Sequence, residues 1–407
     1  MRLQKLSLLV LICAALLAPA AFADDAEEAE KEEARKQAAF KDGAYQVVSD
    51  FNYQYFDGFI EAIDQADMVS RIYGLRLIDQ RIKQQFAENL ENSFEAMVLT
   101  GAGNARAGIL PAWGAPDEGV RYTLLGVESR GDLGRAVVRM DLKNYQFNYQ
   151  EYELRLNEDG DLVVVDWTDY LTGLTFSESV GRYLVMATPS KTALRKMLDF
   201  QNATERELYL FGEMLKAARD GNIGKFKELR DGMHERFQRQ RIVVETGVHV
   251  AKARRQRREM VDALGRMFEH FPDEPLYSLM LLDHLFPSKK YEEGIAALQN
   301  LARKLGFPDA AMDARLSAAH LAAGNPAEAV IHADAAVERE PGLELGWLSA
   351  LSARNATGDY PGAVAALTTL ESEFGHDLGP ENLKKSRVFA DLMASEAFAA
   401  WLEARSQ

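Results

Sequence analysis

The C-terminal half of the chain carries one short pattern three times, and this repetition limits the folds open to it. The copies read KKYEEG from residue 289, GNPAEA from residue 324 and GDYPGA from residue 358, so they start 35 and 34 residues apart. Apolar residues at helical spacing precede and follow each copy. A helix pair cannot bury its apolar face alone, so such pairs stack and share a core. The repetition therefore predicts an array of helix pairs joined by short turns.

The middle copy resembles the tetratricopeptide repeat (TPR) in the residues that set its packing. Leu316 occupies the apolar position of the first helix, Gly324 the turn, and Ala329 a small position where two helices cross closely. The first copy departs from the family, because Lys289 stands where the turn glycine is expected. The resemblance covers residues 275–375 and implies an all-α TPR-like array in this region.

The TPR resemblance also implies a function, because the first helices of such units line a concave groove for a peptide or protein segment. The residues at the family's groove positions are Leu279, Asp283, Ala314, Ala318, Leu348, Ser352 and Asn355. These positions carry little charge and lack the paired Lys and Asn that hold a C-terminal carboxylate in some relatives.

Degenerate repeats are expected over residues 189–274. Capping helices are expected over 376–407, with a helix at Val388–Trp401.

Residues 43–188 have the pattern of an α+β domain. Two amphipathic helices are predicted at Phe51–Tyr73 and Leu77–Leu99, and a loop rich in Gly and Pro at 101–119. The predicted strands lie at 120–128, 135–143, 146–156 and 162–170. Within the third strand the apolar residues change parity, which predicts a bulge near Gln150. The fourth strand contains three consecutive valines, which indicates that both of its faces are covered.

Helices followed by an antiparallel meander resemble the NTF2-like fold, in which a curved sheet wraps helices around a pocket. The phrase VDWTDYLTG at 165–173 adds to this resemblance. The pocket candidates are Tyr145, Tyr149, Asp166, Asp169 and Tyr170. An aspartate whose pKa is raised by apolar walls, with tyrosine donors beside it, can move a proton on a carbonyl compound. This gives an alternative function, a small-ligand-binding protein or enzyme, although the same residues also fit core packing and strand capping.

The N-terminus has the pattern of a secretory signal peptide at residues 1–23. Arg2 and Lys5 precede a run of apolar residues, and Ala21-Phe22-Ala23 forms a small-x-small cleavage site. Cleavage after Ala23 would remove the single cysteine, Cys13, and two positive charges, which takes the net charge from −15 to −17. A cysteine-free exported chain suits an oxidising compartment, and the periplasm is the simplest destination. An acidic, solvated lead-in is expected over residues 24–42.

Composition excludes several classes of function. The net charge of −15 argues against general affinity for nucleic acid. A single cysteine rules out a disulfide scaffold and a Cys-ligated zinc site. All seven histidines lie at or beyond residue 234, so no His–Asp dyad can form within the α+β region, and none belongs to an H-E-x-x-H motif. The sequence thus predicts no catalytic, cofactor-binding or metal-ligating residue.

One basic segment, residues 234–258, stands out from the acidic background with a net charge of +6. Its patch candidates are Arg236, Arg239, Arg254, Arg255, Arg257 and Arg258. One interpretation is a solvated helix face or an internal match for the acidic lead-in. The other is a docking site for an acidic partner or for anionic lipid headgroups. Taken together, the sequence predicts an exported interaction protein that binds a peptide or protein partner through its array.

Overall fold

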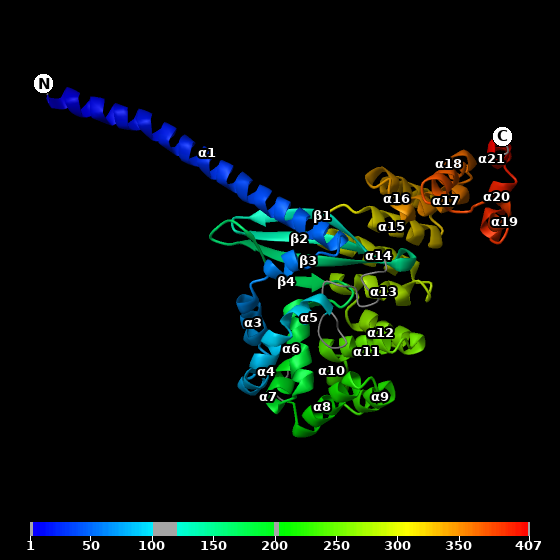
Figure 1. Ribbon diagram of the computed structural model, residues 1–407, viewed down its shortest axis with the longest axis horizontal. Coiled ribbons are helices and arrows are strands. Elements are labelled where there is room, and N and C mark those ends of the chain that lie inside the picture. The colour runs from blue at the N-terminus through cyan, green and yellow to red at the C-terminus, as the bar shows by residue number, and fades with distance from the viewer. Residues whose placement is uncertain (1–2, 101–119, 199–202, 406–407) are drawn as a thin grey trace.

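The computed structural model describes residues 3–100, 120–198 and 203–405. An antiparallel sheet is covered by N-terminal helices on one side and by a run of helix pairs on the other (Figure 1). This is the α+β region followed by an all-helical region of stacked pairs that the sequence predicts. The loop predicted at 101–119 lies outside the described residues.

The N-terminal helices are more broken than predicted. They are α1 (Leu3–Asn52), α2 (Asp57–Glu61), α3 (Gln65–Gly74), α4 (Gln80–Asn92) and α5 (Phe94–Thr100). The acidic lead-in predicted over residues 24–42 is the middle of α1, which continues through the buried Phe40 to the buried Phe51. The first predicted helix divides where Asp64 caps α3 and accepts a hydrogen bond from the backbone N–H of Asp67 (2.9 Å). The second begins at Asp79, which accepts one from Ile82 (3.0 Å), and it is interrupted between Asn92 and Phe94.

The sheet has strands in the order of the chain: β1 (Arg121–Arg130), β2 (Leu133–Asp141), β3 (Phe147–Leu156), β4 (Leu162–Asp169) and β5 (Leu174–Thr175). The bulge predicted near Gln150 is absent from the β2–β3 pairing, whose register runs without a shift. Instead, the β3–β4 register shifts between Glu153 and Leu154, where β4 has an extra residue, Val165. A second shift leaves Leu125 of β1 without a partner in β2.

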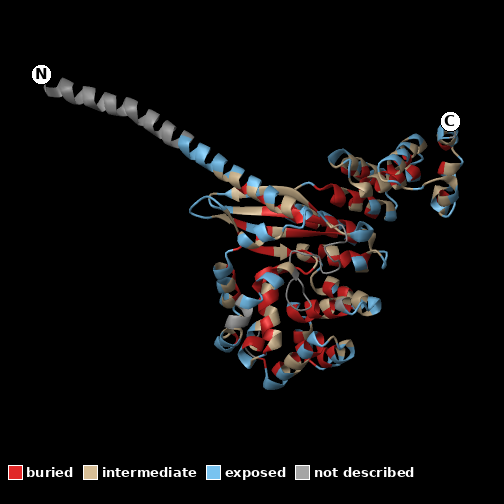
Figure 2. Cartoon of the chain, in the orientation of Figure 1, coloured by how far each residue is buried: buried red, intermediate tan, exposed pale blue. Residues whose placement is uncertain are grey.

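The change of parity in β3 has a different cause, which is burial of both faces of the sheet (Figure 2). Phe147 and Tyr149 pack against the helix pairs, in the same apolar cluster as Leu298. Tyr152 and Leu154 pack against the N-terminal helices. Residues of both parities are therefore apolar along this strand without any bulge, because each set has its own core.

The same two-sided burial organises β2. Ala136, Val138 and Met140 face the N-terminal helices, whereas Val137 faces the helix pairs. Two glycines bring these layers close to the sheet. A Cβ atom at Gly134 would lie 2.6 Å from the ring of Phe40 in α1, and one at Gly126 would lie 2.3 Å from the ring of Phe307. Both positions require glycine because an aromatic ring occupies the space of the missing side chain.

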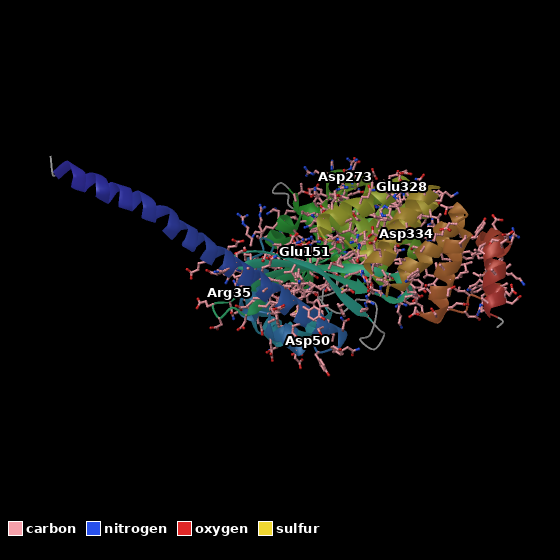
Figure 3. All side chains as sticks on the ribbon, turned by 90° about the horizontal axis from the view of Figure 1, so that it is seen from above. Arg35, Asp50, Glu151, Asp273, Glu328 and Asp334 are labelled. Atoms are coloured by element: carbon pink, nitrogen blue, oxygen red, sulfur yellow. The ribbon has the colours of Figure 1, made fainter. Side chains whose placement is uncertain are left out.

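A helical connection leads from the sheet to the repeated pairs. It comprises α6 (Phe176–Ala187), α7 (Lys191–Met197), α8 (Glu205–Arg219), α9 (Ile223–Asp231), α10 (Glu235–Gln238), α11 (Arg241–Ala253) and α12 (Arg257–His270). The repeated pairs are α13 (Ser278–Leu285) with α14 (Tyr291–Leu305), α15 (Ala310–Ala322) with α16 (Pro326–Arg339), and α17 (Glu344–Thr357) with α18 (Tyr360–Ser372). We call the three repeated pairs the array. Charged side chains such as Asp273, Glu328 and Asp334 lie on the outside of this half (Figure 3).

The turns and crossings of the array follow the predicted pattern. Gly324 and Gly358 adopt left-handed backbone conformations, with φ of 84° and 77°. Lys289 takes the same region with φ of 57°, so the first pair makes the same kind of turn without glycine. Ala329 and Ala363 are fully buried where helices cross. The helix predicted at Val388–Trp401 is interrupted instead: α19 (Pro380–Leu383), α20 (Ala390–Met393) and α21 (Glu396–Arg405) end the chain.

A buried arginine joins the sheet to the array. Arg139 of β2 is fully buried and pairs with Asp309, the N-cap residue of α15. Its Nε donates to Asp141 (2.7 Å) and its Nη2 to Glu340 (2.9 Å). Burial alone would lower the pKa of Arg139, but the three carboxylates outweigh it and raise that pKa. Tyr149 of β3 also donates to Asp309 (2.5 Å), so two strands hold one helix start.

A second buried charge joins α6, the first helix after the sheet, to α11 and to Tyr277 at the start of the array. Glu245 of α11 is fully buried and pairs with Arg182 of α6 and Arg241 (2.8 Å), and it accepts a hydrogen bond from the Tyr277 hydroxyl. Burial would raise the pKa of Glu245, but the two arginines lower it. The sheet, α6 and the array are therefore fixed to one another by buried ionic contacts as well as by apolar packing.

We expect Arg139→Met to lower the free energy of unfolding by about 3–5 kcal/mol, because it leaves buried carboxylates without a counter-charge. Urea unfolding followed by tryptophan fluorescence measures this. Arg121→Met is the matched control, since Arg121 also pairs with Glu340 but is half exposed, and its loss should cost less than about 1 kcal/mol. Equal effects of the two substitutions would contradict the role given to Arg139.

Candidate functional site

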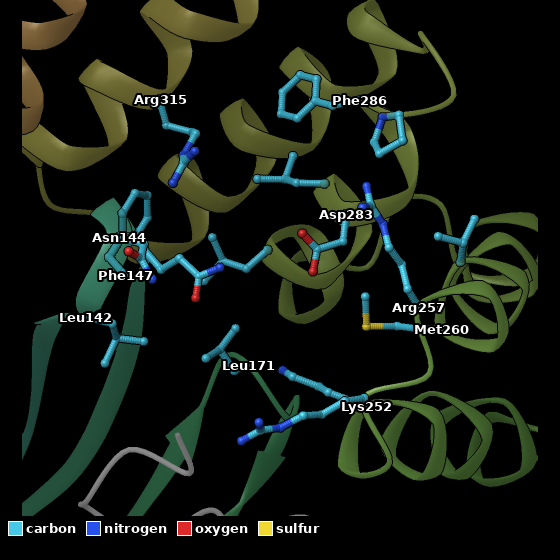
Figure 4. A pocket seen from close by; sticks show the side chains of 16 residues that line it. Leu142, Asn144, Phe147, Leu171, Lys252, Arg257, Met260, Asp283, Phe286 and Arg315 are labelled. Carbon is cyan, nitrogen blue, oxygen red and sulfur yellow. The ribbon is translucent and has the colours of Figure 1, made fainter. Parts of the chain in front are cut away.

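A cavity of about 690 Å³ lies where the sheet, α11–α12 and the array meet (Figure 4). Its apolar wall comes from both sides of this junction: Leu142, Phe147 and Leu171 from the sheet region, and Met260, Leu279 and Phe286 from the helices. The site exists only because the sheet is docked on the array, since neither part supplies the wall alone. A concave apolar wall with a few charged groups is the usual composition of a binding site.

The charged groups of this cavity are unbalanced. Four cations line it, Lys252, Arg255, Arg257 and Arg315, against one carboxylate, Asp283. Within the described part of the chain, the guanidinium groups of Arg255 and Arg257 form no hydrogen bond or ion pair. The chain as a whole has a net charge of −15, so a local excess of cations is unusual for it. Four cations against one carboxylate beside a cavity favour an anionic ligand.

The protein uses only part of the hydrogen-bonding capacity of Arg315 and none of that of the Asp283 carboxylate among the described residues. Arg315 donates one hydrogen bond, to the backbone oxygen of Tyr145 (2.9 Å), and its guanidinium lies 5.3 Å from the centroid of the Phe147 ring. Burial lowers the pKa of Arg315. Among the described residues, Asp283 accepts no hydrogen bond. Burial raises the pKa of Asp283 against the opposing effect of Lys252 and Arg315.

A second cavity, of about 500 Å³, shares a wall with the first. The shared residues are Leu142, Asn144, Gln146 and Phe147. They flank or form the 3-10 turn η2 (Lys143–Tyr145) between β2 and β3. From there the second cavity extends to Glu344 and Phe374 in the region of α17 and α18. The two cavities lie next to each other at this turn, and we call them together the junction groove; their lining residues extend from α12 to α17.

The turn in the middle of the junction groove has an unusual backbone. Asn144 and Tyr145 both have a φ of 59°, a region that L-residues rarely occupy. Contacts to the array hold this conformation: Arg315 donates to the Tyr145 backbone oxygen, and the Tyr145 hydroxyl donates to Glu344. The array therefore shapes the tip of the sheet that divides the groove.

The predicted groove residues of the array do not share one surface. Two line the first cavity, and the others range from exposed to fully buried. Leu279 and Asp283 line the first cavity. Ala318 is exposed, Leu348 and Ser352 are half-buried, and Ser352 donates to the Leu348 backbone oxygen. Ala314 is fully buried and accepts a hydrogen bond from Ser349 (3.2 Å). Asn355 is buried and donates to the backbone oxygen of Val388 (3.0 Å).

The five predicted pocket residues of the α+β region do not converge on one cavity. Tyr145 lines the second cavity, whereas Tyr149 and Tyr170 are buried against the array. The two aspartates are held by the protein itself. Asp166 accepts from the Ser177 hydroxyl (2.5 Å), and Asp169 accepts from Asn148 (2.7 Å) and the Thr172 N–H (2.9 Å). Burial raises the pKa of both carboxyl groups.

The predicted basic patch is divided between three environments. Arg236 lies near Glu207 (3.5 Å) and Arg239 pairs with Glu235. Arg254 donates to the backbone oxygen of Asp220 (2.7 Å). Arg255 and Arg257 line the cavity, and Arg258 is exposed beside them without lining it. Only part of the basic segment therefore contributes to the site.

The sequence pattern does not identify Arg315 or Lys252 as site residues. Lys252 is one of many cations in its segment, and Arg315 lies 63 residues further along the chain. The sequence contains one weak indication of the role of Arg315, which is that it follows the predicted groove residue Ala314 on the first helix of the best-matching unit. Only the docking of η2 against α15 brings these cations to one cavity.

Within the described residues, no group of three or more His, Cys, Asp or Glu side chains is arranged to hold a metal ion. A search of the same residues finds no helix with the length and apolar character that crossing a membrane requires. No protein-family model matches the chain, and no curated protein matches it.

A largely buried histidine lies behind the first cavity. His249 is on α11, between Glu245 and Lys252, and its Nε2 has no hydrogen-bond partner among the described residues. Burial lowers the pKa of His249 to about 4, and the nearby Lys252 adds to this shift. Interactions with Glu245 and the Thr172 backbone oppose it but are weaker. The imidazole is therefore neutral in the folded protein at neutral pH.

We expect stability to fall on acidification because of His249. Its pKa is about 6.5 in an unfolded chain and about 4 in the folded protein. Between these values the unfolded state binds the extra proton, so the free energy of unfolding should drop by about 2 kcal/mol from pH 7 to pH 5. His249→Gln should remove that part of the slope in urea titrations, whereas substitution of the exposed His234 should not. An unchanged slope in His249→Gln would contradict this assignment.

Proposed function

We propose that this protein is an exported binding protein that holds an extended, acidic segment of a partner protein in the junction groove. The observation that carries the proposal is the group of cations at the first cavity, two of which, Arg255 and Arg257, have guanidinium groups with no hydrogen bond or ion pair within the described residues. An anionic segment would supply the missing counter-charges, and the apolar wall would accept its apolar side chains. The groove passes the η2 turn and continues to α17, which suits a chain segment better than a compact ligand.

We further propose that the array is TPR-like and the α+β region NTF2-like. The left-handed turns at Lys289, Gly324 and Gly358 and the fully buried Ala329 and Ala363 support the first assignment. The order of helices followed by an antiparallel meander supports the second. In this proposal the sheet covers one part of the array surface and leaves its rim available, so the partner binds at the junction.

Two features favour a protein segment over a lipid surface. First, Arg255 and Arg257 line a concave cavity together with apolar side chains, whereas the exposed Arg239, which follows α10, is paired with Glu235. Second, Asp283 projects into the same cavity and would repel a densely anionic surface. Binding to anionic lipid headgroups is therefore an outcome that the test below must separate from peptide binding.

Peptide selection tests the proposal. A random decapeptide library displayed on phage and selected on the purified chain should become enriched in Asp and Glu interspersed with apolar residues. Synthetic copies should bind in fluorescence anisotropy and weaken as salt rises, because exposed charges are screened. The double substitution Arg255→Glu and Arg257→Glu should weaken binding by at least about 10-fold, as expected for loss of two charge-assisted contacts.

Arg258→Glu is the matched control, since it changes the same charge on the same helix outside the cavity. It should leave binding within about twofold, in line with a screened rim charge. Selection of neutral or basic peptides, or equal losses in the cavity variant and the control, would refute the proposal. So would binding to vesicles that contain anionic lipid with no binding to any selected peptide.

Export is proposed from the pattern of residues 1–23 and the absence of cysteine after Cys13. When the full chain is expressed in a bacterial host, we expect N-terminal sequencing of the periplasmic fraction to give a chain that starts at Asp24. Replacing Ala21 and Ala23 by Arg should block this cleavage, because the small residues of the site are lost. Recovery of an uncleaved cytosolic chain from the unaltered sequence would contradict export.

A further inference from the structure

Arg315 differs from the other cations of the first cavity in how it is held. Arg255 and Arg257 are exposed, whereas Arg315 is half-buried in the wall, beneath the η2 turn and against the Phe147 ring. Its hydrogen bond to Tyr145 fixes the guanidinium, which is planar and carries five N–H donors. Among the described residues this is its only hydrogen bond, and no carboxylate lies within 4.0 Å of it. A fixed guanidinium with unused donors facing a cavity is suited to a planar carboxylate.

Asp283 adds a second requirement. Figure 4 shows its carboxylate projecting into the space between Arg315 and Arg257, with Lys252 below it near Leu171. The Asp283 carboxylate interacts with these cations only through charge. Among the described residues, none of them donates a hydrogen bond to it. A cavity with four cations and no carboxylate would bind any polyanion. Asp283 lowers the net positive charge and repels a second negative charge brought next to it.

We propose that this cavity is a subsite for a single carboxylate, in which Arg315 anchors the carboxylate and Asp283 excludes more highly charged anions. The inference rests on the proposed function, because the carboxylate belongs to an acidic residue of the bound segment. The segment's adjacent backbone N–H would donate to Asp283, which supplies the acceptor that an extended peptide needs. Arg257 and Lys252 contribute attraction over a longer range.

The exclusion of dianions follows from charge at short range. A phosphoserine side chain carries nearly two negative charges at neutral pH and has three acceptor oxygens. Bound at Arg315, it would bring both charges close to Asp283 in a partly desolvated cavity, where repulsion is stronger than in water. A glutamate side chain brings one charge and can satisfy the planar guanidinium with two parallel hydrogen bonds. The subsite should therefore prefer glutamate although phosphoserine has the larger charge.

The experiment uses peptides from the selection above, synthesised with Glu, Gln or phosphoserine at the selected acidic position, and measures Kd by fluorescence anisotropy. On the unaltered chain, the Glu peptide should bind about 10- to 100-fold more tightly than the Gln peptide. It should also bind more tightly than the phosphoserine peptide. In Arg315→Gln the advantage of the Glu peptide over the Gln peptide should fall to about twofold or threefold, which is what the more distant Arg257 and Lys252 supply. Arg258→Glu should preserve the full discrimination.

Asp283→Asn provides the second, independent arm, because asparagine keeps an acceptor oxygen and loses the charge. This variant should still bind the Glu peptide and should bind the phosphoserine peptide at least about 10-fold more tightly than the unaltered chain does. Circular dichroism checks that both variants fold.

The outcomes separate the two proposals. If peptides bind but Arg315→Gln keeps the Glu preference, the subsite is wrong and the groove stands. If Asp283→Asn leaves phosphoserine binding unchanged, the selecting role of Asp283 is wrong. If no selected peptide binds the unaltered chain, the proposed function fails and this inference fails with it.

Discussion

The contact on which the rest of the structure depends is the ionic cluster around Arg139. A guanidinium buried between a sheet and a helix array is stable only if its charge is matched, and here Asp309, Asp141 and Glu340 match it from the sheet and from two parts of the array. Tyr149 adds a hydrogen bond to the same aspartate that begins α15. Because these partners must all be present together, the cluster fixes the position of the array on the sheet more specifically than apolar packing does. Glu245 performs the same task between α6 and α11.

Docking the array on the sheet has two consequences for function. It covers the second face of the sheet, so Tyr149 of β3 and Tyr170, which follows β4, become part of an interface. It also places the η2 turn against α15, which creates the junction groove and collects cations from α11, α12 and α15 around it. The site is therefore made by an arrangement of parts. Its charge distinguishes it from most of the predicted groove positions of the array, among which Asp283 is the one charged residue.

Local sequence patterns predict some elements of this fold and fail for others. The helix pairs were predictable because each unit repeats its own turn and its own small residues, and these signals are local. The parity change in β3 was misread as a bulge because a pattern of apolar residues does not say how many layers cover a strand. The break before α3 is not predictable from the pattern because a capping aspartate such as Asp64 looks like any polar residue on a helix surface. Arg315 and Lys252 were missed as site residues because nothing in their local sequence relates them.

The sequence by itself determined the α+β region, the helix pairs and their turns, and the excess of cations in residues 234–258, since these depend on spacing and composition. The tertiary structure decided which of those cations have partners, where the groove lies and which side chains line it. The physical reason is the range of the interactions. Helical periodicity and turn conformation act over a few residues, whereas burial and charge pairing depend on segments, such as β2 and α15, that lie far apart in the chain and meet only in the folded protein.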